Sequence, residues 1–150
     1  MAMTEEHVCT VRASMDCLPQ AIGFVEEFCR KRQGARDDVL RLSLIVEELF
    51  TNTVMHGHGG DSDAPVRIGL DGDLLNFELS YEDTAPPFDP LDQGARSTVD
   101  PGDDLSERPV GHFGLVLVVS MAARCSYARE QDRNRLRLTV RRQEPGVVDV

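Results

Sequence analysis

Two stretches in the first half of the chain place their apolar residues at the spacing of an amphipathic helix. In the first, Asp16 is the expected N-cap, Pro19 suits the first turn, and Gly34 marks the end. Its core-facing positions are Ile22, Val25, Phe28 and Cys29. The second is expected to begin near Asp37, where acidic residues favour the helix dipole, and to end at Gly57. Its core-facing positions are Leu42, Ile45, Val46, Leu49, Phe50 and Thr53.

Alternation of apolar and polar residues predicts strands on both sides of these helices. Residues 7–13 form a first candidate strand, although their alternation is poor. Residues 66–71 and 75–81 alternate clearly, and the Asp71-Gly72 pair between them is typical of a hairpin turn. Two adjoining antiparallel strands are therefore expected in the middle of the chain.

The C-terminal part contains an apolar run and a second alternating pair. Residues 115–124 form a mostly apolar run, and the length of this run favours a buried helix over a strand. Residues 126–129 and 136–140 then predict another hairpin, with its turn at residues 132–134. The order of strand, two helices, hairpin, helix and hairpin favours an α+β two-layer sandwich with a mixed, mostly antiparallel sheet covered by three helices.

The length of 150 residues suits one domain, residues 1–150, with its own core. Most of the prolines fall within residues 82–110, which show no sustained periodicity. A loop of this length inside a compact domain is commonly a functional lid or a disordered segment.

The charge and the polar composition exclude several classes of function. A formal net charge of −10 argues against direct nucleic-acid binding, which depends on a basic surface. The chain has no run approaching the ~18 apolar residues of a membrane span, and its first residues do not resemble a signal peptide, so we expect a cytoplasmic protein. Lys31 is the only lysine and lies in a predicted helix, which excludes a P-loop and a protein-kinase fold.

Three short motifs carry the candidate chemistry. Glu48, Asn52 and His56 are four residues apart and lie in a row along one edge of the second helix. The second motif is Asp83-Thr84-Ala85-Pro86-Pro87-Phe88-Asp89-Pro90 after the middle hairpin, and the third is Gly111-His112-Phe113-Gly114-Leu115 before the apolar helix. Each is weak alone, because a solvated polar edge, a turn aspartate and a pair of glycines are all common.

In this order the three motifs resemble the ATP-binding domain shared by gyrase, Hsp90, histidine kinases and MutL. More closely, they resemble its stand-alone bacterial branch, the anti-sigma factor serine/threonine kinases of the RsbW and SpoIIAB type. The resemblance extends from the first helix to Arg142. It implies a Bergerat-type ATP-binding fold, with an ATP lid at about residues 91–110.

The resemblance also assigns roles to the motif residues. Glu48 would be the catalytic base that accepts a hydroxyl proton. Asn52 would be a metal ligand, because its amide oxygen suits Mg²⁺. Asp83 would accept a hydrogen bond from the adenine amino group. The residues implied in binding ATP are Asn52, His56, Asp83, Ala85, Phe88, Arg108, Gly111, His112, Phe113, Gly114 and Leu115.

The chain departs from the family pattern at two places near the implied site. The family usually has a glycine two residues after the adenine-binding aspartate, where this chain has Ala85, whose Cβ could crowd the base. The second glycine box holds only Gly111 and Gly114. Asn134 stands near where the wider superfamily often has a Gly-Thr pair before the final strand.

The leading expectation is an ATP- and Mg²⁺-dependent serine/threonine protein kinase in a partner-switching circuit. By resemblance it would bind a sigma factor, phosphorylate a STAS-domain anti-anti-sigma protein, and form a homodimer. The alternative, motivated by Ala85 and the reduced glycine box, is a non-catalytic nucleotide-binding module that sequesters a partner. A third hypothesis is a metal hydrolase that uses His56, His58, Asp61 and Asp63.

Overall fold

A computed structural model of the protein describes residues 7–90 and 112–143, without the side chains of residues 112, 113 and 116. The expected lid at residues 91–110, with Arg96 and Arg108, and Gly111 lie outside the described residues. The strands are β1 (His7–Arg12), β2 (Pro65–Gly72), β3 (Asn76–Asp83), β4 (Arg124–Glu130) and β5 (Arg133–Arg141). The helices are α1 (Leu18–Lys31), α2 (Arg36–Asn52) and α4 (His112–Met121), with a short 3₁₀ turn η1 (Met15–Cys17) and a π-helical turn η2 (Thr53–Gly57).

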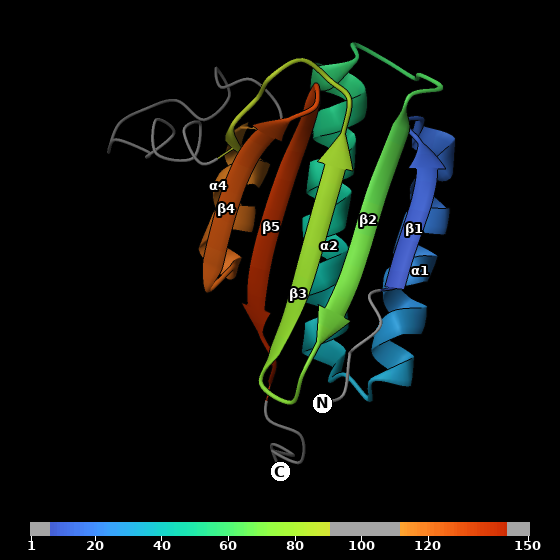
Figure 1. Ribbon diagram of the computed structural model, residues 1–150. Coiled ribbons are helices and arrows are strands. Elements are labelled where there is room, and N and C mark those ends of the chain that lie inside the picture. Colours follow the sequence, from blue (N-terminus) through green and yellow to red (C-terminus); the bar gives the residue numbers. More distant parts are fainter. Residues whose placement is uncertain (1–6, 91–111, 144–150) are drawn as a thin grey trace.

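The strands form one open sheet in the order β1-β2-β3-β5-β4, and the helices cover one of its faces (Figure 1). Every neighbouring pair among the described strands is antiparallel, so this part of the sheet is not mixed. The α+β two-layer architecture expected from the order of elements is confirmed. Among the described residues, no helix is long and apolar enough to cross a membrane.

The core lies between the helical layer and the inner face of the sheet. All six predicted core positions of the second helix are buried, and so are the alternating positions of β2 and β3. Phe28 of α1 and Phe77 of β3 meet edge to face, with their ring centroids 5.9 Å apart. Burial of aromatic and aliphatic side chains in this layer holds α2 against the middle of the sheet.

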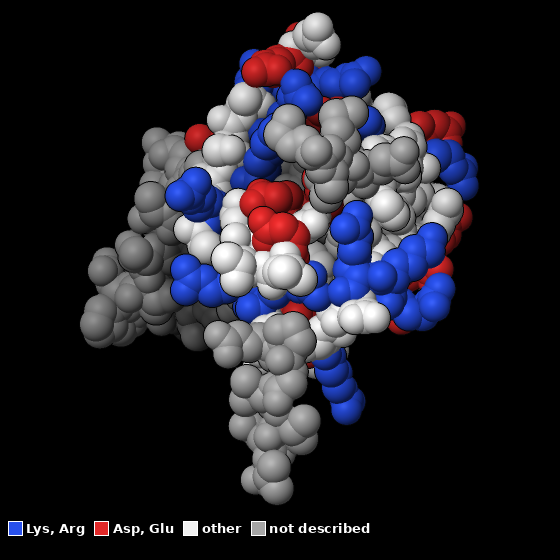
Figure 2. All heavy atoms as spheres, turned by 60° about the horizontal axis from the view of Figure 1, so that its bottom comes forward, with Lys and Arg blue, Asp and Glu red and all other residues white. Residues whose placement is uncertain are grey.

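Charged side chains hold together the end of the molecule at which α2 begins. The Asp38 carboxylate in the first turn of α2 is fully buried, and Arg41 Nη2 donates to it at 2.6 Å. The backbone N–H of Gln143 donates to the same carboxylate at 3.0 Å. Arg142 lies over the Phe77 ring, with its guanidinium carbon 4.5 Å from the ring centroid. Figure 2 brings this end forward and shows Lys and Arg side chains gathered around a small group of acidic ones.

The ends of several elements differ from the sequence predictions. The N-cap of α1 is Cys17, because Asp16 lies in η1 and instead accepts a hydrogen bond from the Ser14 hydroxyl at 2.5 Å. The middle hairpin turns at residues 73–75 and not at Asp71-Gly72, because the Asp73 carboxylate accepts hydrogen bonds from the backbone N–H groups of residues 75 and 76, both at 2.8 Å.

The turn of the final hairpin begins one residue earlier than predicted. Gln131 and Asp132 form its turn with φ values of 52° and 60°, a left-handed pair that matches the twist of the flanking strands. Asn134 therefore belongs to β5, where it pairs with Asp83 of β3.

Candidate functional site

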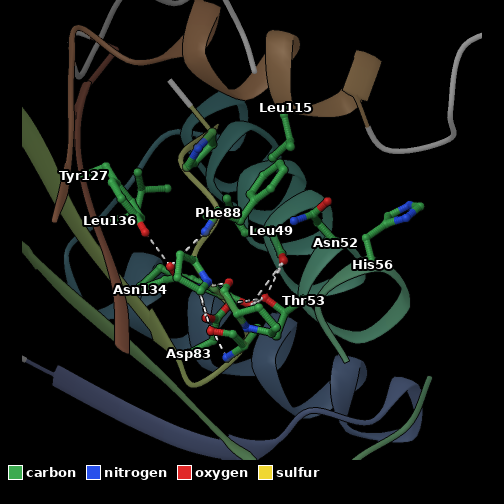
Figure 3. Close-up of a pocket in the computed structure, with 16 residues that line it drawn as sticks. Leu49, Asn52, Thr53, His56, Asp83, Phe88, Leu115, Tyr127, Asn134 and Leu136 are labelled. Atoms are coloured by element: carbon green, nitrogen blue, oxygen red, sulfur yellow. Dashed lines mark hydrogen bonds between the residues drawn. The ribbon is translucent and has the colours of Figure 1, made fainter. Parts of the chain in front are cut away.

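A pocket opens between the C-terminal part of α2, the loop after β3, strand β5 and the start of α4 (Figure 3). Its empty volume, counted together with the open space at its mouth, is about 660 Å³. The side chains around it are mostly apolar, with a few polar groups among them. They include Leu49, Asn52, Thr53, His56, Tyr81, Asp83, Ala85, Phe88, Leu115, Tyr127, Asn134 and Leu136.

Asp83 is the only acidic residue lining this pocket in the described part of the chain. It ends β3, and only 8% of its surface is exposed. Its Oδ2 accepts a hydrogen bond from the Thr53 hydroxyl at 2.7 Å. Its Oδ1 accepts hydrogen bonds from Asn134 Nδ2 at 2.8 Å and from the backbone N–H of Ala85 at 3.2 Å. Donors from three segments thus fix the orientation of one carboxylate.

A pair of buried hydroxyls supports the α2 side of Asp83. The Tyr81 hydroxyl lies 2.6 Å from Thr53 Oγ1 and donates to the carbonyl oxygen of Leu49 at 3.2 Å. Burial raises the pKa of Tyr81 well above its usual value, so the phenol keeps its proton at neutral pH. The single proton of Thr53 can reach the Leu49 carbonyl oxygen at 3.0 Å or Asp83 Oδ2 at 2.7 Å, and when Tyr81 donates to Leu49 the Thr53 proton is left for Asp83.

Ala85 replaces the glycine that the resemblance leads one to expect, and its methyl group lies against Gly57. Ala85 is 2% exposed, and a Cβ built on Gly57 would be 2.8 Å from the Ala85 Cβ. The methyl group therefore occupies space that a side chain at position 57 would need. The π-helical turn η2 brings Gly57 to this position, and such turns are frequent at functional sites.

Asn134 is a site residue whose role could not be recognised from the sequence. Its Nδ2 donates to Asp83 and also lies within 3.0 Å of the Pro86 carbonyl oxygen. Its Oδ1 accepts from the Tyr127 hydroxyl at 2.5 Å and from the backbone N–H of Phe88 at 3.2 Å. Figure 3 shows these contacts converging beside Asp83.

Glu48 lies one turn before Asn52, and its carboxylate is packed against α4. A Cβ built on Gly114 would lie 1.9 Å from Glu48 Oε2, so position 114 tolerates no side chain while Glu48 keeps this position. Partial burial, and to a lesser extent the neighbouring Glu47, raises the pKa of Glu48. A raised pKa is a property of many general bases, and it also arises in purely structural carboxylates.

The other predicted site residues divide into three groups. Asn52, His56, Asp83, Ala85, Phe88 and Leu115 line the pocket together. His56 is exposed, and its ring extends away from the hydrogen-bonded cluster (Figure 3). Gly114 lies on α4 next to Glu48. The side chains of His112 and Phe113, and the whole of Arg108 and Gly111, lie outside the described part of the chain.

The polar groups that line the pocket suit a purine base better than a transition-metal ion. An apolar slot that contains an acceptor-only carboxylate suits a flat ring with an amino group. In the described residues, no group of three or more His, Cys, Asp or Glu side chains is placed to hold a metal ion, so the hydrolase hypothesis based on His56, His58, Asp61 and Asp63 has no such group. The amide of Asn52 borders the same pocket and is a suitable hard ligand for an ion that arrives with phosphate.

The two-layer α+β fold and the pocket that contains Asp83 are consistent with a nucleotide-binding domain. Residues 11–140 match the family model described as "Histidine kinase-like ATPase domain". The chain therefore belongs to the family of histidine kinase-like ATPase domains, and a domain of this kind binds ATP.

Solved structures show the same fold. The chain is similar to the RsbU and RsbW domains of Rv1364c from Mycobacterium tuberculosis, with a TM-score of 0.63 and 17% sequence identity. The match covers 95% of this chain and 34% of that chain, so this chain spans about a third of the length of that structure. Among curated protein sequences there is no significant match.

Proposed function

We propose that this protein is an ATP-dependent serine/threonine protein kinase and anti-sigma factor of the RsbW type. Its partners would be a sigma factor and a STAS-domain anti-anti-sigma protein, and it would act in the cytoplasm as a homodimer without contacting nucleic acid. The single observation that carries the proposal is the placement of Asp83, Asn52 and Glu48. Asp83 and Asn52 line one pocket, and Glu48 lies one helical turn from Asn52.

The proposed reaction transfers the terminal phosphoryl group of ATP to a serine or threonine hydroxyl of the partner. A bond forms between that hydroxyl oxygen and the γ-phosphorus, and the bond from the γ-phosphorus to the oxygen bridging it to the β-phosphorus breaks. The hydroxyl proton passes to Glu48, and ADP leaves. Phosphoryl transfer depends mainly on positioning and charge neutralisation.

The residues of the pocket would each serve one part of this reaction. Asp83 would accept a hydrogen bond from the adenine amino group, while the apolar side chains around it exclude water from the base. The Asn52 amide oxygen would help to hold Mg²⁺, which neutralises phosphate charge when it is bound. Glu48 would orient the partner's hydroxyl and take its proton, and its raised pKa brings it closer to the working pH of a general base.

The kinase proposal is tested by incubating the protein with Mg²⁺, γ-labelled ATP and its candidate STAS-domain partner. We expect label on a serine or threonine of the partner. Glu48→Gln should lower the transfer rate roughly 10²- to 10⁴-fold, the usual contribution of general-base catalysis, while ATP binding is retained. Glu47→Gln is the matched control, because Glu47 is its exposed neighbour on α2. Absence of both label and ATP binding in the unaltered protein would overturn the proposal.

One observation favours the alternative of a non-catalytic module. The Glu48 carboxylate contacts Gly114 of α4, and Glu48 is not among the described residues that line the pocket. ATP binding without any phosphoryl transfer, together with retention of a partner protein, would support this second function.

A further inference from the structure

We propose that Asn134 is a positioning residue that makes the pocket selective for 6-aminopurines over 6-oxopurines. It does so by holding the Asp83 carboxylate in one orientation and directing a hydrogen-bond donor at it. This inference rests on the proposed use of ATP, and it adds the residue on which the choice of base depends.

The hydrogen bonds of Asn134 allow only one orientation of its amide group. Nδ2 faces three oxygen atoms, namely Asp83 Oδ1 at 2.8 Å and the carbonyl oxygens of Pro86 at 3.0 Å and Ala85 at 3.2 Å. On the other side, Oδ1 receives two donors, the Tyr127 hydroxyl and the backbone N–H of Phe88. A flipped amide would place an oxygen against three acceptors and its NH₂ group against the backbone N–H of Phe88, which can only donate. The amide therefore presents its NH₂ group to Asp83.

The same network determines how much of the carboxylate is left for a ligand. A carboxylate has about four lone-pair sites, two on each oxygen. Asn134 and the backbone N–H of Ala85 take two on Oδ1, and Thr53 takes one on Oδ2. One acceptor site on Oδ2 remains for a further donor. A 6-amino group can supply that donor, whereas the 6-oxo group of inosine or guanosine would bring an acceptor towards the carboxylate.

Asn134 contributes more to this selectivity than an ordinary buried contact would. It joins β5, β4 and the loop after β3, so its loss would remove one donor each from Asp83 Oδ1 and the Ala85 carbonyl oxygen, which keep the backbone N–H of Ala85 and Arg129, and the donor of the Pro86 carbonyl oxygen. Sites built to hydrogen-bond one ligand group discriminate strongly against analogues that lack it, because the buried polar atoms of the site are then left unpaired. The selectivity consequently depends on a residue 51 positions away from Asp83 in sequence.

The test compares binding of Mg-ATP and Mg-ITP by calorimetry in the unaltered protein and in Asn134→Asp. ITP carries a 6-oxo group where ATP carries a 6-amino group, and its phosphates are the same. The substitution keeps the size of the side chain and replaces the donor with an oxygen. We expect ATP affinity at pH 7.5 to fall at least about tenfold, as for loss of a hydrogen bond to a charged group, while ITP affinity changes less than about threefold.

A second readout is the pH dependence of ATP binding. In Asn134→Asp two carboxylates would face each other and would share a proton at low pH. ATP affinity should therefore become dependent on pH in this variant, an effect that a general loss of packing would not produce. Asn76→Asp is the matched control, because it makes the same substitution at the other end of β3.

Tyr127→Phe is a milder variant that keeps the test available if Asn134→Asp fails to fold. It removes only the hydroxyl that holds Asn134 Oδ1 and should lower the ratio of ATP to ITP affinity in the same direction. Equal binding of ATP and ITP by the unaltered protein, or an unchanged ratio in both variants, would overturn the inference. Failure of the unaltered protein to bind any nucleotide would instead refute the proposed function.

Discussion

Gly114→Ala should lower phosphoryl transfer by displacing the Glu48 carboxylate. The new Cβ would lie 1.9 Å from Glu48 Oε2 and 2.6 Å from its Cδ, whereas ordinary contact begins at 3.4 Å. The carboxylate must therefore move by about 1.5 Å, which a glutamate side chain can do by changing rotamer. A misplacement of about 1 Å in a catalytic group can cost roughly 10²-fold in rate.

The folded protein should tolerate this substitution well. Alanine is favoured over glycine inside a helix by up to about 1 kcal/mol, and this gain offsets the strain of moving the flexible end of Glu48. We expect the thermal unfolding midpoint to change little, because the residue that must shift is partly exposed.

The assay separates the catalytic step from nucleotide binding. Single-turnover transfer from labelled ATP gives the rate, and calorimetry gives ATP affinity. We expect the rate to fall about 10²-fold with ATP affinity nearly unchanged. The transfer rate of the double variant with Gly114→Ala and Glu48→Asp should fall by less than the product of the two single-variant decreases, because the shorter Asp side chain leaves room for the new Cβ at position 114. Transfer at the unaltered rate in Gly114→Ala would refute the reasoning, and a fall confined to ATP affinity would assign Gly114 to the phosphates instead.

Three further predictions concern stability and reactivity. The pKa of the Glu48 carboxyl group is raised in the folded protein, so the folded state binds the carboxyl proton more tightly than the unfolded state does. The free energy of unfolding therefore falls as the pH rises from the unfolded-state pKa of Glu48 to its folded-state pKa. Glu48→Gln should therefore raise the unfolding midpoint at pH 7, and this advantage should vanish on acidification below the usual glutamate pKa of 4.5; an equal advantage at pH 3 would contradict the linkage. Gly57→Ala should destabilise the protein by about 1–3 kcal/mol through overpacking against Ala85, and adding Ala85→Gly should recover most of this loss in urea unfolding. Cys29 is buried and Cys125 is partly buried, and desolvation raises the pKa of each thiol to about 11, so both should resist alkylation at pH 8 in the native protein and react in urea; rapid native labelling of both would contradict this.

Local periodicity explains why most of the fold could be predicted from the sequence. The core-facing row of α2 is strictly periodic, and each of its apolar positions is buried. The family resemblance of the short motifs that contain Asp83 and Asn52 implied both residues at the site, and both line the pocket.

The parts that could not be predicted depend on contacts between distant segments. Asn134 meets Asp83 only because β3 and β5 pair in one particular register, and the predicted turn of the final hairpin was placed too late to reveal it. The contact of Gly57 with Ala85 depends on a π-helical turn that has no local sequence signature. Gly114 was implied in ATP binding, and the structure places it against Glu48, a contact that requires the packing of α4 on α2.

The position of β5 in the sheet has a consequence for how the nucleotide site comes into being. This strand is the last of the described elements in sequence, yet it lies between β3 and β4 in the interior of the sheet. During synthesis the earlier strands and helices emerge first, and the pocket is incomplete until β5 inserts and brings Asn134 to Asp83. Nucleotide affinity should accordingly appear late on the folding pathway, because it requires pairing between residues far apart in the chain. ATP would then stabilise the finished domain by mass action without favouring its partly folded precursors.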